Sequence, residues 1–137
     1  MLFFWNKNKR KKNFYKYLLF KIDRDTWNME LRIITIKEIR EGIRREFDKT
    51  HEAIKGLGEE IEKLKAEPKT DMDKVKNLAE TKIKFEADAE KMQEQMIGKW
   101  SEKEQRYVGG IDEEIKGVEE KIAGGQEFKG LIQRELK

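Results

Sequence analysis

The sequence predicts an all-α protein, an antiparallel helical bundle with coiled-coil-like packing. Apolar residues recur every three or four positions along most of the 137-residue chain. Charged residues make up 43% of the chain, which suits helices with one narrow apolar face. There is one Pro and no Cys, so the composition excludes a disulfide scaffold and a Pro-rich chain. We expect four helices, a short N-terminal one and three long ones.

The first element of the chain, residues 1–34, is a basic and aromatic-rich segment. Residues 1–28 contain eight Lys or Arg, two Asp and eight of the 13 aromatic residues. Such a shift in composition indicates a part of the chain with its own role. An alternative is that the native protein starts at Met29, because the basic and aromatic-rich composition ends just before that residue.

Local periodicity predicts one short helix in this segment. Phe14, Leu18 and Ile22 are four residues apart, which favours an amphipathic helix over residues 9–24. Residues 31–36 are rich in β-branched side chains, but no partner strand is visible elsewhere. We interpret them as an extended link or as the early part of the first long helix.

The bundle itself is expected over residues 35–137, with helices at residues 35–66, 71–108 and 111–136. Thr35 and Glu38 fit the capping-box pattern, so we place the first helix start there. Pro68 ends that helix, because the residue before Pro disfavours helical geometry. Thr70 or Asp71 then caps the next helix.

Paired glycines mark the end of the second long helix and a weak point in the third. Gly109-Gly110 predicts a helix stop, whereas Gly124-Gly125 leaves open one helix or two short ones. The apolar rows of the three helices predict the core: Ile39, Ile43, Phe47, Ile54, Leu57, Ile61, Leu64, Leu78, Phe85, Met92, Met96, Ile115, Val118, Ile122 and Leu136. Because these rows are narrow, we expect a homodimer to complete the core.

Two regions are candidate contact sites. The basic N-terminal segment could neutralise phosphates and stack on bases, or lie on an anionic membrane together with Phe3, Phe4 and Trp5. The residues expected to make this contact are Lys7, Lys9, Arg10, Lys11, Lys12, Phe14, Tyr15, Lys16 and Tyr17. A row of Met92, Met96 and Trp100 on the second long helix could form an adaptable protein-binding surface, although core packing also explains it.

No catalytic, metal-binding or cofactor-binding motif is present. His51-Glu52 begins like the zinc-protease helix motif, but Lys55 stands where the second His is needed. The chain has one His and no phosphate-binding glycine loop. We therefore expect a protein without cofactors that is not an enzyme and that acts in protein–protein interaction or assembly. Nucleic-acid binding and peripheral membrane association through the N-terminal segment are the alternatives.

The chain also lacks the apolar run of a signal peptide or of a membrane-spanning helix, which predicts a cytoplasmic or host-intracellular protein. Its many Lys and Glu residues and its lack of Cys resemble hyperthermophile proteins. Over its whole length, the chain resembles the small helical proteins encoded by viruses and plasmids of hyperthermophilic archaea, including spindle-shaped Pyrococcus viruses. That resemblance implies a viral protein, with a virion component as one alternative. The expected architecture is similar to the four-helix bundles of cell-adhesion adaptors.

Overall fold

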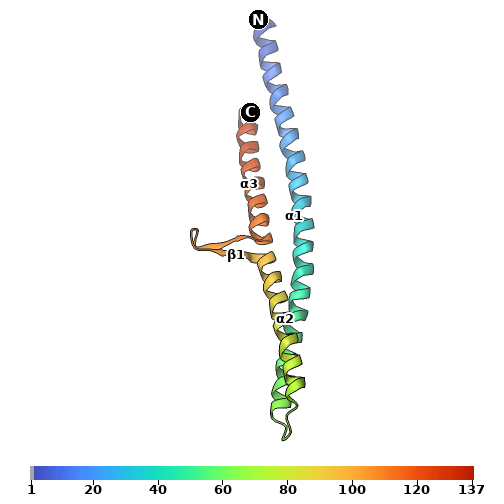
Figure 1. Cartoon of the computed structure of the whole chain (residues 1–137). Helices are drawn as coiled ribbons and strands as arrows, with labels where there is room; N and C mark the ends of the chain where they lie inside the picture. Colours follow the sequence, from blue (N-terminus) through green and yellow to red (C-terminus); the bar gives the residue numbers. More distant parts are fainter. Residues whose placement is uncertain (1) are drawn as a thin grey trace. The chain divides into compact units, whose positions relative to one another are not determined.

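A computed structural model describes residues 2–137, with side chains described from Lys7 onward. The elements follow the order α1 (Leu2–Lys65), α2 (Met72–Ile97), β1 (Gly98–Ser101), β2 (Arg106–Gly109) and α3 (Ile111–Leu136) (Figure 1). The all-α class is confirmed. The prediction of four helices is wrong, since the described residues form three helices and one two-stranded hairpin.

The long first helix accounts for the difference in helix number. α1 runs without a break through the residues expected to form a separate short helix and a link. Thr35 lies in the interior of α1 and therefore does not begin a helix. Its hydroxyl donates a hydrogen bond to the carbonyl oxygen of Leu31 (3.1 Å). The chain stays helical here because one heptad-spaced row of half-buried and buried side chains continues through the segment.

We call this row the inner row of α1. Its steps alternate between four and three residues, and no member is exposed: Tyr15, Leu19, Ile22, Thr26, Met29, Ile33, Ile36, Arg40, Ile43, Phe47, Thr50, Ile54, Leu57, Ile61 and Leu64. The row passes through Arg40, not through Ile39, which was expected in the core but is 55% exposed. The predicted core was wrong at this point because it included the apolar Ile39 and did not follow the alternating steps of four and three residues.

The chain forms two compact units, Met1–Lys37 with Glu114–Lys137, and Glu38–Glu113. This division differs from the predicted boundary at residue 35. In the first unit, α3 runs antiparallel to α1, as the pairs between the two helices show. These pairs are Asp23 with Lys129 (2.6 Å), Thr26 with Gln126 (3.3 Å) and Arg32 with Glu114 (2.8 Å).

In the second unit, α2 returns antiparallel to α1 after a turn that contains Pro68 (Figure 1). The side chain of Asp71 caps α2 by accepting a hydrogen bond from the backbone N–H of Lys74 (3.3 Å), as expected for one of the two predicted caps. The row of α2 that is half-buried or buried consists of Val75, Leu78, Lys82, Phe85, Ala89, Met92 and Met96.

The second helix was predicted to reach residue 108, but α2 ends at Ile97. Gly98 has a φ of +91°, a backbone conformation that favours glycine, and it directs the chain into a β-hairpin that projects from the end of α2. Trp100 pairs with Tyr107 in this hairpin. α3 then starts at Ile111 and continues through Gly124 and Gly125 without a break.

The buried side chains are distributed over all three helices. They are Ile36, Ile61, Val75, Ala89, Met96, Ile115, Val118 and Ile132, together with the polar Thr26. Of the predicted core, Ile61, Met96, Ile115 and Val118 are buried, and the others apart from Ile39 are half-buried. A core in which most side chains are only half-buried is expected of helices that pack in pairs.

Candidate functional site

The most distinctive surface of the first unit is a second periodic row on α1. We call it the outer stripe; it consists of Tyr17, Phe20, Arg24, Trp27, Leu31 and Ile34. Its steps are again three and four residues, and it follows heptad positions that the inner row does not occupy. Its five apolar side chains are between 43% and 63% exposed. A row of this regularity on the solvent side of a helix indicates a surface for another helix.

The charges around the outer stripe are uneven along α1. At the stripe's own spacing, the row continues to Arg10 and Asn13 in one direction and to Glu38 and Glu41 in the other. Arg24, the one charged residue within the stripe, lies 3.7 Å from the carboxylate of Asp25. The row is therefore basic at one end, apolar in the middle and acidic at the other end.

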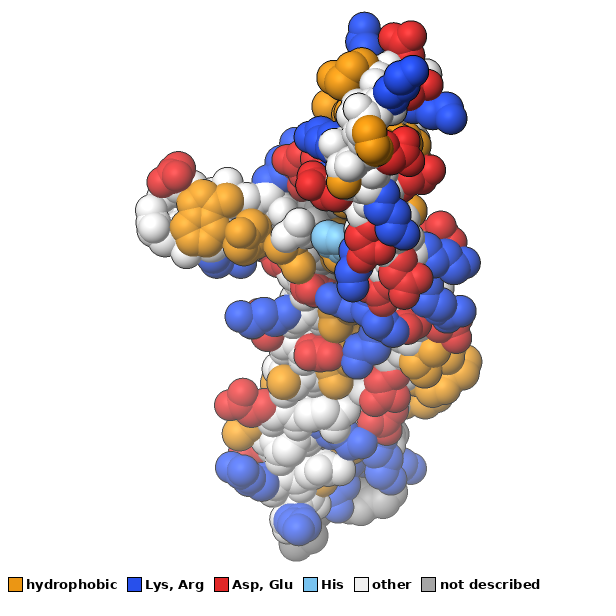
Figure 2. Space-filling view, turned by 90° about the horizontal axis from the view of Figure 1, so that it is seen from below, with side chains coloured by type: hydrophobic (Ala, Val, Ile, Leu, Met, Phe, Trp, Pro, Cys, Tyr) orange, Lys and Arg blue, Asp and Glu red, His pale blue; other side chains and the backbone are white. Residues whose placement is uncertain are grey.

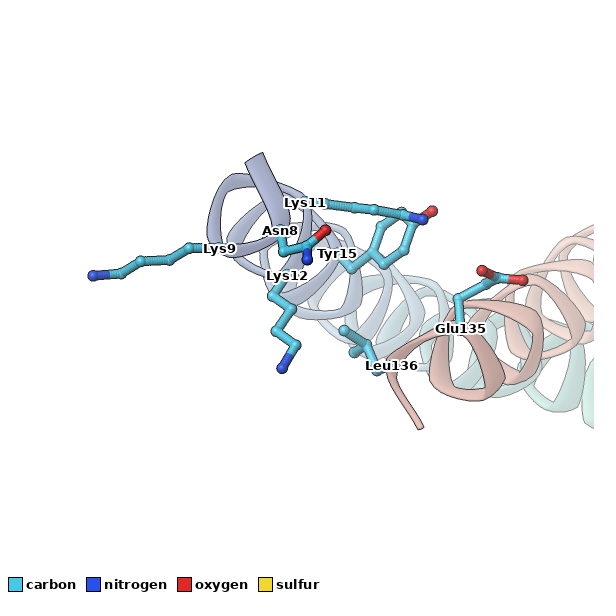
Figure 3. Close-up of a pocket in the computed structure, with 7 residues that line it drawn as sticks. All are labelled: Asn8, Lys9, Lys11, Lys12, Tyr15, Glu135 and Leu136. Carbon is cyan, nitrogen blue, oxygen red and sulfur yellow. The ribbon is translucent and has the colours of Figure 1, made fainter. Parts of the chain in front are cut away.

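The basic residues predicted to contact nucleic acid or membrane are all on α1, and all are exposed. Some of them line a hollow of about 530 Å³ together with the end of α3: Asn8, Lys9, Lys11, Lys12, Tyr15, Glu135 and Leu136 (Figure 3). The Lys11 ammonium is 5.6 Å from the centre of the Tyr15 ring, a cation–π distance. Lysines beside a helix C-terminus also stabilise it through the helix dipole, so this hollow has a structural explanation.

The aromatic members of the predicted contact set have different environments. Tyr15 belongs to the inner row and is half-buried, whereas Phe14 is 56% exposed and Tyr17 belongs to the outer stripe. The structure brings two of the three together, since the ring centroids of Phe14 and Tyr15 are 6.3 Å apart with planes at 41°. Phe3, Phe4 and Trp5, named for the membrane alternative, lie outside the described side chains.

The predicted row of Met92, Met96 and Trp100 is not a row on one helix. Met96 is buried and Met92 is half-buried on α2, but Trp100 lies on β1. Trp100 instead faces Tyr107 across the hairpin, with ring centroids 5.1 Å apart and planes at 73°. Figure 2 shows hydrophobic side chains on this projecting hairpin. The aromatic pair is the feature of the second unit that the sequence reasoning missed.

Three consecutive carboxylates at the start of α3, those of Asp112, Glu113 and Glu114, make specific contacts. Asp112 accepts two hydrogen bonds from the Arg40 guanidinium, and these raise the pKa of Arg40 above its ordinary value. Glu113 accepts from the backbone N–H of Gly109 and from Arg106 (3.3 Å), which holds the base of the hairpin. Their position directly after Gly109-Gly110 was the available signal.

A second arginine–carboxylate pair lies on the surface of α1. Arg44 donates to the Glu41 carboxylate, and this hydrogen bond lowers the pKa of Glu41 and raises the pKa of Arg44. His51 packs edge-on against Phe47 with ring centroids 4.5 Å apart. Within the described residues, no three His, Asp or Glu side chains gather in a way that could hold a metal ion.

None of the three helices described over residues 2–137 combines the length and hydropathy of a membrane span. Comparisons with known proteins matched the chain to no protein family, no curated protein and no solved structure. The outer stripe on α1 and the aromatic hairpin both expose large apolar side chains, and they are the surfaces from which we infer a function.

Proposed function

We propose that the protein is a non-enzymatic assembly protein that works as a homodimer, in which the outer stripes of two copies pack on each other. The observation that carries this proposal is the heptad spacing of exposed apolar side chains on the solvent side of α1. A narrow row with steps of three and four suits a facing helix, whereas a lipid surface favours a broader apolar face.

The size of the stripe supports a helix partner of this kind. Large apolar side chains present up to about 200 Å² each, so five that are roughly half exposed offer about 500 Å² per copy. Stable interfaces bury about 800 Å² per partner, and flanking side chains such as Phe14 and Lys21 can supply the difference. The flanking charges of Asp23 and Lys37 are already paired with Lys129 and Glu119 of α3.

The charge distribution favours a second copy in the antiparallel direction. With a two-fold axis between Arg24 and Trp27, the basic end of each row faces the acidic end of the other. Arg10 then comes opposite the partner's Glu41, whose carboxylate also accepts from Arg44 of its own chain. Arg24 then lies against the partner's Trp27, where a cation–π contact is favourable. A parallel dimer would place the two Arg24 side chains side by side in the seam, which is repulsive.

Sedimentation velocity tests the dimer. We expect the unmodified chain to sediment as a dimer and the double variant Phe20→Glu/Leu31→Glu to be a monomer, because four carboxylates would face each other in the seam. The matched control is Met72→Glu/Ile83→Glu, which adds the same charge at apolar positions of α2 that are at least as exposed as Phe20 and Leu31. If the unmodified chain is a monomer, the proposal is wrong. Co-sedimentation of that monomer with vesicles would then favour peripheral membrane association, and salt-sensitive DNA binding would favour a nucleic-acid-binding protein.

Cysteine crosslinking tests the orientation. The chain has no Cys, so single introduced thiols can form disulfides only with each other. In the antiparallel dimer, Phe20 of one copy is opposite the partner's Leu31. A mixture of Phe20→Cys and Leu31→Cys should therefore crosslink as the mixed pair. Predominant crosslinking of Phe20→Cys with itself would show that the dimer is parallel.

A further inference from the structure

The β-hairpin presents two aromatic rings that its own unit does not cover. Trp100 and Tyr107 are 48% and 49% exposed, although they are among the largest apolar side chains of the second unit. They occupy directly opposite positions on β1 and β2 and contact each other edge to face. Because an isolated two-stranded hairpin is only marginally stable in water, an exposed aromatic pair on it calls for a further explanation.

The base and the tip of the hairpin are both held in place. At the base, a Cβ built on Gly110 would be 2.4 Å from the nitrogen of Gly98, so the two glycines bring the ends of the hairpin together. Glu113 bonds to the backbone of Gly109 and to the Arg106 guanidinium. At the tip, the carbonyl oxygen of Ser101 accepts from the backbone N–H of Gln105 (2.8 Å). The aromatic pair is therefore presented on a braced hairpin.

Between this pair and α2 lies a hollow of about 340 Å³, which we call the hairpin groove. Its lining residues are Glu90, Gln93, Glu94, Gly98, Lys99, Trp100 and Tyr107. The two glutamates carry negative charge, and the faces of the Trp and Tyr rings are electron-rich. Lys99 is the one cation among the lining residues, so the carboxylates exceed it in number.

We propose that the hairpin groove binds an arginine or lysine side chain of a basic polypeptide segment. The cation would lie over the aromatic pair, where cation–π attraction is strongest for Trp, and would pair with Glu90 or Glu94. The apolar stem of the same side chain can lie along the rings. Phosphate-rich ligands are disfavoured, because their charge has the same sign as the two carboxylates.

This proposal does not depend on the homodimer, since no residue of the outer stripe lines the groove. The probe is a fluorescent hexa-arginine peptide titrated into the full-length protein and followed by anisotropy. We expect Glu90→Gln/Glu94→Gln to weaken binding about tenfold and Trp100→Ala about fivefold, from lost charge pairing and lost cation–π contact. Glutamine is a good helix former, so the first variant keeps α2 intact even if the second disturbs the hairpin.

Two matched controls separate the groove from general electrostatics. Glu59→Gln/Glu60→Gln removes two exposed carboxylates of α1. Phe128→Ala removes an aromatic side chain of α3 that is 49% exposed and lies outside both the groove and the outer stripe. Neither variant should change the affinity by more than about twofold. Equal affinity of the unmodified protein and the Glu90→Gln/Glu94→Gln variant would overturn the proposal. Equal binding of a hexa-glutamate peptide would overturn it as well.

Discussion

Thr26 and Arg40 place polar groups within the otherwise largely apolar inner row of α1. Thr26 is 7% exposed and accepts a hydrogen bond from Gln126, and Arg40 bonds through both of its contacting nitrogens to Asp112. Each polar pair joins residues at fixed positions of two helices, so sliding one helix along the other by a turn would break it. We infer that these two residues fix the register of helix pairing, the first within one unit and the second within the other.

At the residue scale, Ile36 and Ile39 test the phase of the inner row. Ile36 is 9% exposed and Ile39 is 55% exposed, although the two are less than one helical turn apart. We expect Ile36→Ala to lower the free energy of unfolding by about 2–4 kcal/mol, because it leaves a cavity. Ile39→Ala should change it by less than about 0.5 kcal/mol. Urea denaturation measures both, and a larger loss at Ile39 would show that the phase is wrong.

The hairpin is the element that departs from helical periodicity. The last buried position of α2 is Met96, and the row of α3 starts at Ile111, 15 residues later. The hairpin, residues 98–109, accounts for twelve of these 15 residues. The three that remain equal one step of the heptad spacing that both helices follow. We interpret β1, β2 and their loop as an insertion into one helical pattern, which is made possible by the close approach of Gly98 and Gly110.

At the element scale, two glycine substitutions should have opposite effects. Gly98 has a positive φ, and a Cβ there would be 2.1 Å from the carbonyl oxygen of Val108. We expect Gly98→Ala to lower the free energy of unfolding by about 2 kcal/mol or more and to weaken the near-ultraviolet circular dichroism of the Trp100–Tyr107 pair. Gly124→Ala meets no atom within 4 Å in α3 and should stabilise the protein by about 0.5–1 kcal/mol. A neutral Gly98→Ala would mean that the hairpin base tolerates a side chain.

At the scale of the whole molecule, the N-terminal segment is a structural partner of α3. Asp23 pairs with Lys129, Thr26 bonds to Gln126, and a Cβ on Gly125 would be 3.9 Å from Ile22. These contacts bear on the alternative that the native protein begins at Met29. Such a chain would lack every one of the α1 residues in these pairs, and the last turns of α3 would lose them as partners.

Hydrogen exchange tests this consequence. A version that starts at Met29 should lose amide protection over residues 125–136, whereas α2 should keep the protection that it has in the full chain. The reason is that the second unit, Glu38–Glu113, contains no residue that is removed. Unchanged protection over residues 125–136 would show that the first 28 residues do not support α3.

Much of the helical structure could be predicted from local signals. The stop at Pro68, the cap at Asp71 and the start at Ile111 depend on the residues at those positions. The capping-box signal at Thr35 failed because the inner row continues through Ile33 and Ile36 and keeps the chain helical there. The hairpin could not be predicted from periodicity, since its eight strand residues are too few and its aromatic pair also fits a helical row.

The sequence by itself determined that the chain is helical, since the heptad spacing and the helix ends are properties of neighbouring residues. It also contained two rows on α1, the inner row and the outer stripe, with the same spacing. Only the tertiary structure decided which row faces α3 and which remains exposed, because burial depends on the partner helix and its polar pairs. The hairpin was decided in the same way, since its strands obtain their hydrogen bonds from each other and its position from the glycines at its base.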